Sequence, residues 1–410
     1  MATHYAVQTR VFGNAVQKVK SLAWAFAMLG LWSCTQTPPP EPTSPGLQTD
    51  ICETGSLTLD ADFSGGGMVG CRIVDEHTIE VALKPEDRPI NASPWYAVRL
   101  SPKEAVEANI VLLYEEHPHR YEPKTSPDGV FWTPLPASAV ESEADGYRVT
   151  IRLKIEDRPL LLTAQEVFTN EAYDDWVAQA TDKPFLSSEV FGESIEGRAL
   201  TVLRSSAAET QDRKTVMLVG RQHPPEVTGA LAMISFMDEV TNDSELSQTF
   251  RERFNLVMIP NLNPDGVERG HWRHNLGGLD LNRDWGPFTQ VETQAVKRLV
   301  DEIGDEMTLF LDFHSTSHNT FYTQPEGTDG TDYDFTATWL SRARARIPDY
   351  EFAIQGSHQL DLPTSKTYIH ERFNIPAITY ELGDETDRAM IDESAKVFAQ
   401  EMMTLLLEEE

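Results

Sequence analysis

Two histidines and two glutamates follow apolar, strand-like runs in the second half of the chain. The runs and the residues after them are Thr215–Gly220 with His223 and Glu226, Thr308–Phe313 with His314, and Ala377–Tyr380 with Glu381. In open α/β sheets the carboxyl ends of strands converge on one crevice, so these side chains could meet there. Two imidazoles and a carboxylate suit zinc with a fourth position for water, and the other glutamate could take that water's proton. The pattern indicates the chemistry of a zinc hydrolase.

The H-x-x-E pattern occurs three times, so sequence context must decide which copy could hold a metal. The copies are His77/Glu80, His119/Glu122 and His223/Glu226. Around the first copy the sequence alternates like a strand, where positions three apart point to opposite faces, and the second lies in a turn-rich stretch. In the third copy, Pro224-Pro225 suits a strand-to-helix turn that would let both side chains face one point. We therefore expect His223 and Glu226 to be metal ligands. The alternative is a buried structural histidine and a first-turn glutamate stabilised by the helix dipole.

The third ligand could be His314 or His318, which both lie in the segment from Asp312 to His318. The position at a strand end favours His314. His318 falls in a Ser/Thr/Asn-rich loop, where a histidine is more often a surface residue or a substrate contact.

The pattern of apolar and polar residues changes near residue 164. From about Ser56 to Leu162, short alternating segments separated by turn residues predict a sandwich of antiparallel strands. Beyond it, buried-strand runs alternate with longer amphipathic segments, which predicts an α/β domain with a mixed sheet. The fourth run is Leu256–Pro260, and the predicted helices are Val227–Val240, Val291–Ile303, Tyr333–Ile347 and Ala389–Leu407.

The net charge excludes some partners. The 65 acidic and 34 basic side chains among 410 residues give a formal net charge of −31, which repels nucleic acids and anionic lipid surfaces. We expect no nucleic-acid partner. The length leaves room for two substantial domains.

The N-terminus has the features of an export signal. Arg10, Lys18 and Lys20 precede an apolar run from Leu22 to Trp32 that is too short to span a bilayer as a mature helix. The residues up to Cys34 resemble the lipobox of bacterial lipoproteins, in which the cysteine becomes the lipidated first residue of the mature chain. A plain secretory signal with an incidental cysteine is the alternative.

We therefore expect four regions along the chain. They are a lipoprotein-type signal peptide at 1–34, a proline-rich tether at 35–50, a β-sandwich domain at 51–163 and a catalytic domain at 164–410. Export would place the body in an oxidising compartment, where Cys52 and Cys71 are candidates for one disulfide.

Two further motifs and one arginine complete the pattern. Asn263-Pro264-Asp265-Gly266 is a strong turn signal, while Arg273, Asn282 and Arg283 supply positive charge and an amide in an acidic chain. With His223-Pro224-Pro225-Glu226 and Leu281-Asn282-Arg283, the segment Gln222–Glu381 resembles the zinc metallocarboxypeptidases related to carboxypeptidase A. It is most similar to the cytosolic carboxypeptidase branch, in which a β-sandwich precedes the catalytic domain.

The resemblance implies a role for each matched residue. One zinc per chain would bind to His223, Glu226 and His314, with Glu381 as general base and acid. Arg273 would polarise the scissile carbonyl, and Asn282 and Arg283 would bind the terminal carboxylate of the substrate. Asp280 would orient His223 through the other ring nitrogen.

The sequence departs from the family pattern in two places. Pro225 replaces the usual glycine of H-P-G-E, and counting back from Glu381 puts Gln359 where the pancreatic enzymes carry a mobile tyrosine. The same count puts Lys366 near the floor of the pocket for the C-terminal side chain, which would favour acidic residues. The alternative for Lys366 is a solvated surface lysine.

We expect an exported zinc carboxypeptidase, periplasmic or at the cell surface, that is anchored to the membrane through Cys34 and acts on peptide or protein C-termini. One alternative is a deacylase or amidase on the same fold, acting on N-acyl amino acids or cell-wall peptides. The other is a catalytically relic lipoprotein that binds peptides or glycans.

Overall fold

The computed structural model describes residues 50–91, 93–205, 213–325, 331–356 and 358–409. The predicted signal peptide, Cys34 and nearly all of the predicted tether lie outside these ranges. The described residues all belong to one compact unit. No helix within the described ranges is long and apolar enough to cross a membrane.

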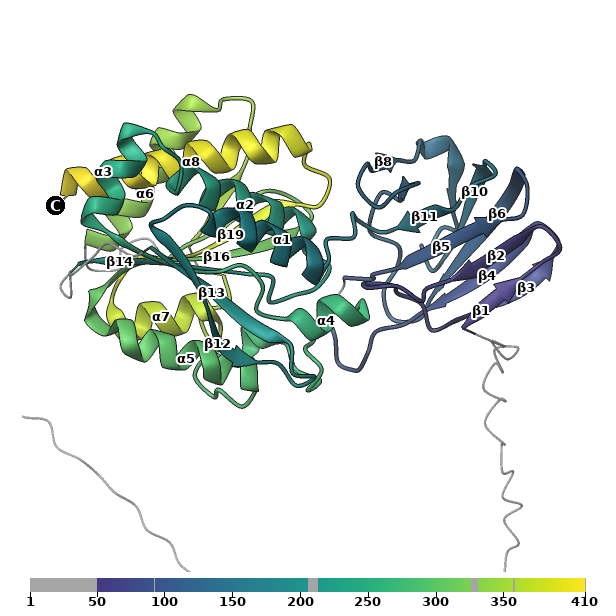
Figure 1. Cartoon of the computed structure of the whole chain (residues 1–410), viewed down its shortest axis with the longest axis horizontal. Helices are drawn as coiled ribbons and strands as arrows, with labels where there is room; N and C mark the ends of the chain where they lie inside the picture. The colour runs from purple at the N-terminus through teal and green to yellow at the C-terminus, as the bar shows by residue number, and fades with distance from the viewer. Residues whose placement is uncertain (1–49, 92, 206–212, 326–330, 357, 410) are drawn as a thin grey trace, which may run out of the picture. The chain divides into compact units, whose positions relative to one another are not determined.

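The first eleven strands form two sheets (Figure 1). The six-stranded sheet has the order β1-β2-β5-β11-β7-β8, and the five-stranded sheet has the order β3-β4-β6-β10-β9. Their bounds are β1 Ile51–Glu53, β2 Leu57–Asp60, β3 Gly70–Asp75, β4 Thr78–Leu83, β5 Ala97–Pro102, β6 Val106–Tyr114, β7 Lys124–Ser126, β8 Thr133–Pro134, β9 Val140–Ser142, β10 Arg148–Ile155 and β11 Leu160–Thr163; a 3-10 turn, η1, covers Ala137–Ala139.

These strands are half-buried, as their alternating sequences predict. In β10 the side chains of Val149, Ile151 and Leu153 are buried, while Arg152 and Lys154 are exposed, because successive side chains of a strand point to opposite faces. The pairing is antiparallel among the described strands of both sheets except between β4 and β6, which run parallel.

A disulfide joins Cys52 on β1 to Cys71 on β3, so it links the six-stranded sheet to the five-stranded sheet.

The remaining strands form one mixed eight-stranded sheet in the order β12-β13-β15-β14-β16-β19-β17-β18. Its strands are β12 Leu186–Glu193, β13 Ala199–Ser205, β14 Thr215–Gly220, β15 Asn255–Ile259, β16 Met307–Thr316, β17 Thr320–Tyr322, β18 Ala353–Gln355 and β19 Ala377–Gly383. The central strands β15, β14, β16 and β19 run parallel. Every residue of β14 is buried, which explains why its sequence lacks polar alternation.

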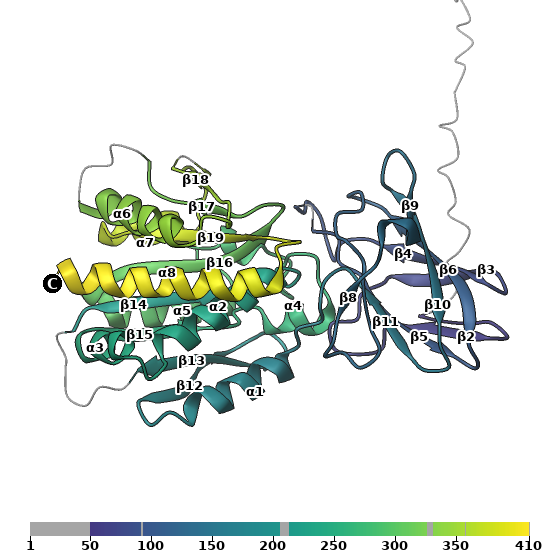
Figure 2. The ribbon, with the colours of Figure 1, turned by 90° about the horizontal axis from the view of Figure 1, so that it is seen from above.

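Helices cover both faces of this sheet (Figure 1). The bounds are α1 Asn170–Thr181, α2 Val227–Val240, α3 Glu245–Arg253, α4 Pro264–Arg269, α5 Val291–Ile303, α6 Thr331–Arg346, α7 Ser365–Phe373 and α8 Arg388–Glu409, with 3-10 turns η2 Leu281–Arg283 and η3 Gly304–Glu306. One core packs α2, α3, α6 and α8 against the sheet, and a second core packs α5 and α7 against the opposite face. Figure 2 shows α8 running along the middle of the first layer.

Two predicted helices, Val227–Val240 and Val291–Ile303, have the bounds seen in the structure. Strand β16 is longer than predicted and continues through His314 to Thr316. The reason is pairing: β16 stays in register with β19 as far as Thr316 opposite Gly383. His314 therefore lies within a strand rather than in the loop after it.

The sandwich and the α/β region share apolar packing. Val227, the first residue of α2, and Trp272 are both buried in the core of the sandwich. The sandwich thus contacts the beginning of the helix that follows Glu226 and the segment that carries Arg273.

Candidate metal centre

The first two candidate ligands lie in the turn between β14 and α2. Glu226 is the residue that precedes the first turn of α2. Arg221, which has a positive φ of 52°, donates from Nε to the Pro224 carbonyl at 2.8 Å. The Nδ2 of Asn263 donates to the Gln222 carbonyl at 3.1 Å. Two side chains therefore hold the backbone of the ligand turn, and Asn263 belongs to the N-P-D-G motif.

The third candidate ligand faces this turn from the carboxyl end of β16. Gly229 on α2 allows the close approach, because a Cβ there would lie 2.5 Å from the carbonyl oxygen of His314. The amide of Gly229 donates to Ser315 Oγ at 2.8 Å. The N-terminal turn of α2 is thus fixed against the strand that carries His314.

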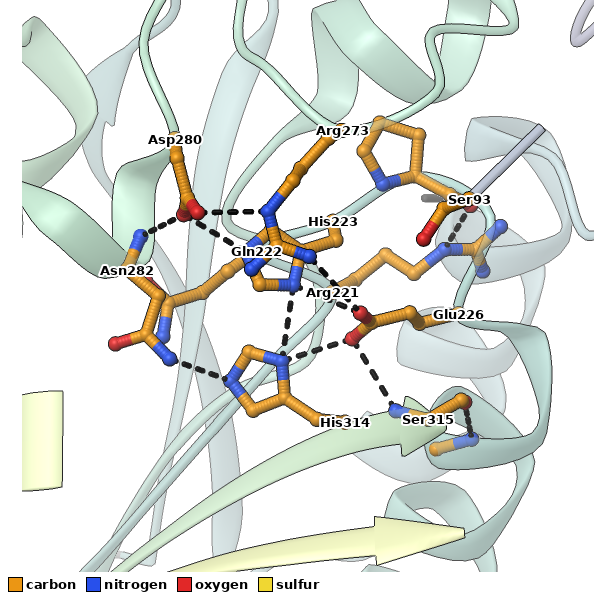
Figure 3. A network of polar contacts seen from close by, with 12 residues as sticks. Ser93, Arg221, Gln222, His223, Glu226, Arg273, Asp280, Asn282, His314 and Ser315 are labelled. Atoms are coloured by element: carbon orange, nitrogen blue, oxygen red, sulfur yellow. Dashed lines mark hydrogen bonds and ion pairs between the residues drawn. The ribbon is translucent and has the colours of Figure 1, made fainter. Parts of the chain in front are cut away.

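His223, Glu226 and His314 converge on one point (Figure 3). His223 Nδ1 lies 2.9 Å from Glu226 Oε1, and His314 Nδ1 lies 2.8 Å from Glu226 Oε2. The two Nδ1 atoms are 3.1 Å apart. All three residues are buried, so two imidazoles and a carboxylate present their ligand atoms to the same small space.

The remaining ring nitrogens show that this donor set fits a metal ion. His223 Nε2 lies 2.8 Å from Asp280 Oδ1, and His314 Nε2 lies 2.9 Å from Asp312 Oδ2. A carboxylate at Nε2 favours the proton on that nitrogen, which leaves the Nδ1 lone pair directed at the centre. The prediction that Asp280 contacts His223 agrees with this geometry, and Asp312 is the equivalent partner of His314.

The electrostatics of the centre favour a cation. Burial alone would raise the pKa of Glu226, but His223 and His314 hold this pKa well below its usual range. Burial alone would lower the pKa of His314, yet Asp312 and Glu226 raise it well above its usual value. The Glu226 carboxylate is therefore kept ionised, and its surroundings stabilise a positive charge next to it. A divalent metal ion would supply that positive charge.

His318 does not share this position. Its side chain is exposed, and its Nδ1 lies 3.0 Å from Ser317 Oγ. Of the two histidines that could have been the third ligand, the structure brings His314 to the centre.

Glu381 lies beside the centre on β19, directly opposite His314 on β16. Its Oε2 atom is buried and has no hydrogen-bond partner among the described residues. Burial raises the pKa of Glu381 to about 8, with His314 and Arg273 acting against the rise and Glu226 adding to it. A carboxyl group with this environment is suited to exchange a proton near neutral pH.

Arg273 reaches the same centre from the loop after α4. Its Nε donates to Asp280 Oδ2 at 2.7 Å, and its Nη1 lies 3.9 Å from Glu226 Oε1. Asp280 therefore contacts both His223 and Arg273 (Figure 3). Burial disfavours the charged form of Arg273, but Asp280 and Glu226 raise its pKa, so its guanidinium stays charged.

Asn282 and Arg283 lie on the 3-10 turn that follows Asp280. Asn282 Nδ2 is 3.2 Å from His314 Nε2, and its Oδ1 accepts from the Ser365 amide at 2.9 Å. Arg283 Nη2 donates to Gln359 Oε1 at 2.9 Å. Gln359 therefore contacts a residue expected to bind substrate, and it does so with a positive φ of 52°.

One cavity of about 430 Å³ joins these groups. Its walls include the three candidate ligands, Arg273, Asn282, Arg283, Lys366 and Glu381. Lys366 is buried, and its Nζ donates to the Thr323 carbonyl at 3.4 Å. The cavity is also lined by Ser93 and Arg120 of the sandwich. Figure 3 shows Ser93 on the Glu226 side of the centre and Asn282 on the other side.

Several residues that shape the site were not predicted from the sequence. Asp312 was visible two positions before His314, and residues so spaced on a strand share one face. Gln222 donates to Asp312 Oδ2 at 2.6 Å and accepts from Trp285, but nothing in its sequence neighbourhood marks it. Tyr322 and His358 stack with ring centroids 3.9 Å apart and line the cavity. The contacts of Gln222, Tyr322 and His358 depend on chain pairings that no local pattern reveals.

The chain is similar to known zinc carboxypeptidases in sequence and in fold. Residues 173–402 match the family described as zinc carboxypeptidase. The cytosolic carboxypeptidase 2 of Danio rerio is 33% identical over 139 residues, which are 32% of this chain and 19% of that protein. The match thus spans far less than two thirds of that relative.

Solved structures share the fold over most of the chain. The metallo-carboxypeptidase from Burkholderia cenocepacia has a TM-score of 0.73 at 19% identity, covering 86% of this chain and 98% of that one. The metallo-carboxypeptidase from Pseudomonas aeruginosa, in complex with (2-guanidinoethylmercapto)succinic acid, has a TM-score of 0.71 at 21% identity, covering 86% and 100%. The predicted α/β fold with a preceding β-sandwich is confirmed.

Proposed function

Because the chain belongs to the zinc carboxypeptidase family, we propose that it is a zinc-dependent carboxypeptidase that removes the C-terminal residue from peptides or proteins. The observation that carries the proposal is the convergence of His223, Glu226 and His314 in a cavity that also holds Glu381 and Arg273. A relic binding protein would have no need for a complete ligand set beside a buried carboxyl oxygen that has no hydrogen-bond partner in the described part of the chain.

The residues around the centre divide the reaction between them. Zinc, when bound, supplies Lewis acidity to the scissile carbonyl and to water. Glu381 accepts the proton of the attacking water on its buried Oε2 and later gives it to the leaving amine. Arg273, held by Asp280 at 2.7 Å, donates to the carbonyl oxygen as negative charge develops there.

Recognition of a free C-terminus would come from the opposite side of the cavity. Asn282 and Arg283 place an amide and a guanidinium next to each other on η2, and a guanidinium binds a carboxylate in bidentate fashion. The contact from Arg283 to Gln359 would keep the guanidinium in place until substrate arrives.

Lys366 would give the pocket a preference for acidic C-terminal residues. Its ammonium is buried at the cavity wall, where a substrate carboxylate would find a charged partner in a medium of low dielectric. Burial lowers the pKa of Lys366 to about 8, so the side chain is charged at neutral pH.

Peptides with free and amidated C-termini test the activity directly. We expect mass spectrometry to show loss of single residues from the free peptide and none from its amidated twin. Equal cleavage of both, or release of N-acyl groups from amino acids with no action on peptides, would instead support the deacylase or amidase alternative. If the zinc-loaded protein hydrolyses none of these substrates, the relic binding protein is the remaining alternative.

We also propose that the chain is exported and lipidated at Cys34. The support is the sequence alone, in which basic residues, an apolar run and a lipobox-like segment precede five prolines. Mass spectrometry of the mature N-terminus should find a diacylglyceryl group on Cys34. An unmodified terminus that begins elsewhere would reduce the lipobox to coincidence.

A further inference from the structure

Glu86, in the segment after β4 of the sandwich, binds the backbone of the segment that carries Arg273. Its Oε2 accepts from the Trp272 amide at 2.7 Å, and its Oε1 accepts from the amides of Arg273 and His274 at 2.9 and 2.6 Å. Three consecutive N–H groups thus point at one carboxylate, an arrangement that backbone nests use to hold anions.

These amides belong to a segment outside the helices and strands, so no helix or strand of the described ranges supplies them with backbone acceptors. Hydrogen bonds to an ionised acceptor are about twice as strong as neutral ones. Both sequence neighbours of Arg273 also contact the sandwich. Asp87 binds Nδ1 of His274, which follows Arg273, and Trp272, which precedes it, is buried in the core of the sandwich. The sandwich therefore fixes the backbone on both sides of Arg273.

The guanidinium of Arg273 must be placed accurately between two carboxylates. Its Nη1 lies 3.9 Å from Glu226 Oε1, and its Nε is bonded to Asp280, so a shift of its backbone would move the guanidinium relative to the ligand carboxylate. A misplacement of about 1 Å in an active site can cost about 100-fold in rate.

We propose that Glu86 is a positioning residue that acts through Arg273, so that the β-sandwich contributes to stabilisation of the transition state. The inference rests on the proposed function, because it assigns Arg273 to the carbonyl oxygen. Among the described residues, the hydrogen bonds of Glu86 go to the backbone amides of 272–274 and not to a metal ligand or a substrate-binding side chain. Its effect would therefore appear in kcat rather than in KM.

Glu86→Gln is the main test, because the amide nitrogen would face N–H donors while the side chain keeps its size. We expect kcat to fall about 10- to 100-fold, as for residues that orient catalytic groups, with KM within about threefold of wild type and one zinc retained. Glu86→Asp keeps the charge and should recover part of the loss. It also gives the same readouts should Glu86→Gln fail to fold.

The matched control is Ser64→Ala. Ser64 Oγ donates to Glu268 Oε2 at 2.8 Å, so this variant removes a different hydrogen bond between the sandwich and the α/β region. It should leave kcat unchanged. Hydrogen exchange of the amides of 272–274 should accelerate in Glu86→Gln and not in Ser64→Ala. This measurement reports on the hydrogen bonds between Glu86 and the three amides without any assay of activity.

A double-mutant cycle with Arg273→Ala distinguishes positioning from general support of the fold. If Glu86 acts through Arg273, Glu86→Gln should cost nothing more in the Arg273→Ala background. The inference would be overturned by additive losses of kcat in the double mutant, by an equal loss of kcat in Ser64→Ala, or by unchanged hydrogen exchange of the three amides in Glu86→Gln. Hydrolysis of peptides by the wild type would still support the proposed function in each of these cases. A wild type that hydrolyses no peptide would overturn both.

Discussion

His314 on β16 and Glu381 on β19 are direct partners across two parallel strands. The pairing places the metal-facing imidazole and the candidate proton carrier at the same level of the sheet. Because the backbones of both residues are bonded into the central strands, neither can move far without breaking the sheet. The relative position of metal and base is thus a property of strand register.

Glu381→Gln is expected to keep the fold and the zinc but to lose about 100- to 10,000-fold in kcat, the range that a general base contributes. The amide cannot accept the proton of water at Oε2. Turnover should be measured alongside zinc content and circular dichroism. A kcat near that of wild type would remove Glu381 from the mechanism.

Replacing His314 by alanine should abolish stoichiometric zinc binding, because a buried nitrogen ligand is lost from the centre. His318→Ala is the matched control, since the exposed His318 lies four positions along the same segment. Metal analysis after dialysis reads both variants. Retention of one zinc by His314→Ala together with its loss from His318→Ala would exchange the two assignments.

Asp312→Asn should weaken zinc binding about 10- to 100-fold, because carboxylates behind ligating histidines orient the ring and raise its basicity. Asp280→Asn should do the same through His223. Asp305→Asn, an exposed carboxylate on η3, is the control and should not change the affinity. Competition with a fluorescent chelator measures all three, and equal affinities throughout would contradict the roles of Asp280 and Asp312.

The sequence was sufficient to place the strands that carry the chemistry. Fully apolar runs such as β14 are recognisable because both faces are buried, and His223, His314 and Glu381 follow or end such runs. The partners Gln222 and Glu86 were not predicted, because their roles depend on which strands and loops become neighbours. The role of Asp312 was not predicted either, although its spacing from His314 on one strand places the two side chains on the same face. Glu86 lies 187 positions before Arg273, and no periodic pattern connects two such segments.

Lys366 should make the release of C-terminal Glu or Asp faster than that of Leu. Burial lowers the pKa of Lys366 to about 8, so its charge is present below pH 8 and is lost as the pH rises through that value. The ratio of kcat/KM for acidic over apolar C-termini should therefore fall between pH 7 and 9. Lys366→Met should remove the preference at every pH.

The release of C-terminal Leu is the control for the Lys366→Met variant. If Lys366→Met lowers the release of Leu as much as that of Glu, the lysine supports the pocket without selecting the substrate. A wild type that prefers apolar or basic C-termini would contradict the pocket assignment and leave the carboxypeptidase proposal standing.

The most direct test of the account is a zinc titration of metal-free protein, followed by the release of a C-terminal residue from a peptide. The three candidate ligands form a single centre. Activity should therefore be absent without metal, rise in proportion to added zinc and reach its plateau at one zinc per chain. Hydrolysis that persists in the metal-free protein, or a plateau that bears no relation to one zinc per chain, would contradict the assignment of catalysis to His223, Glu226 and His314.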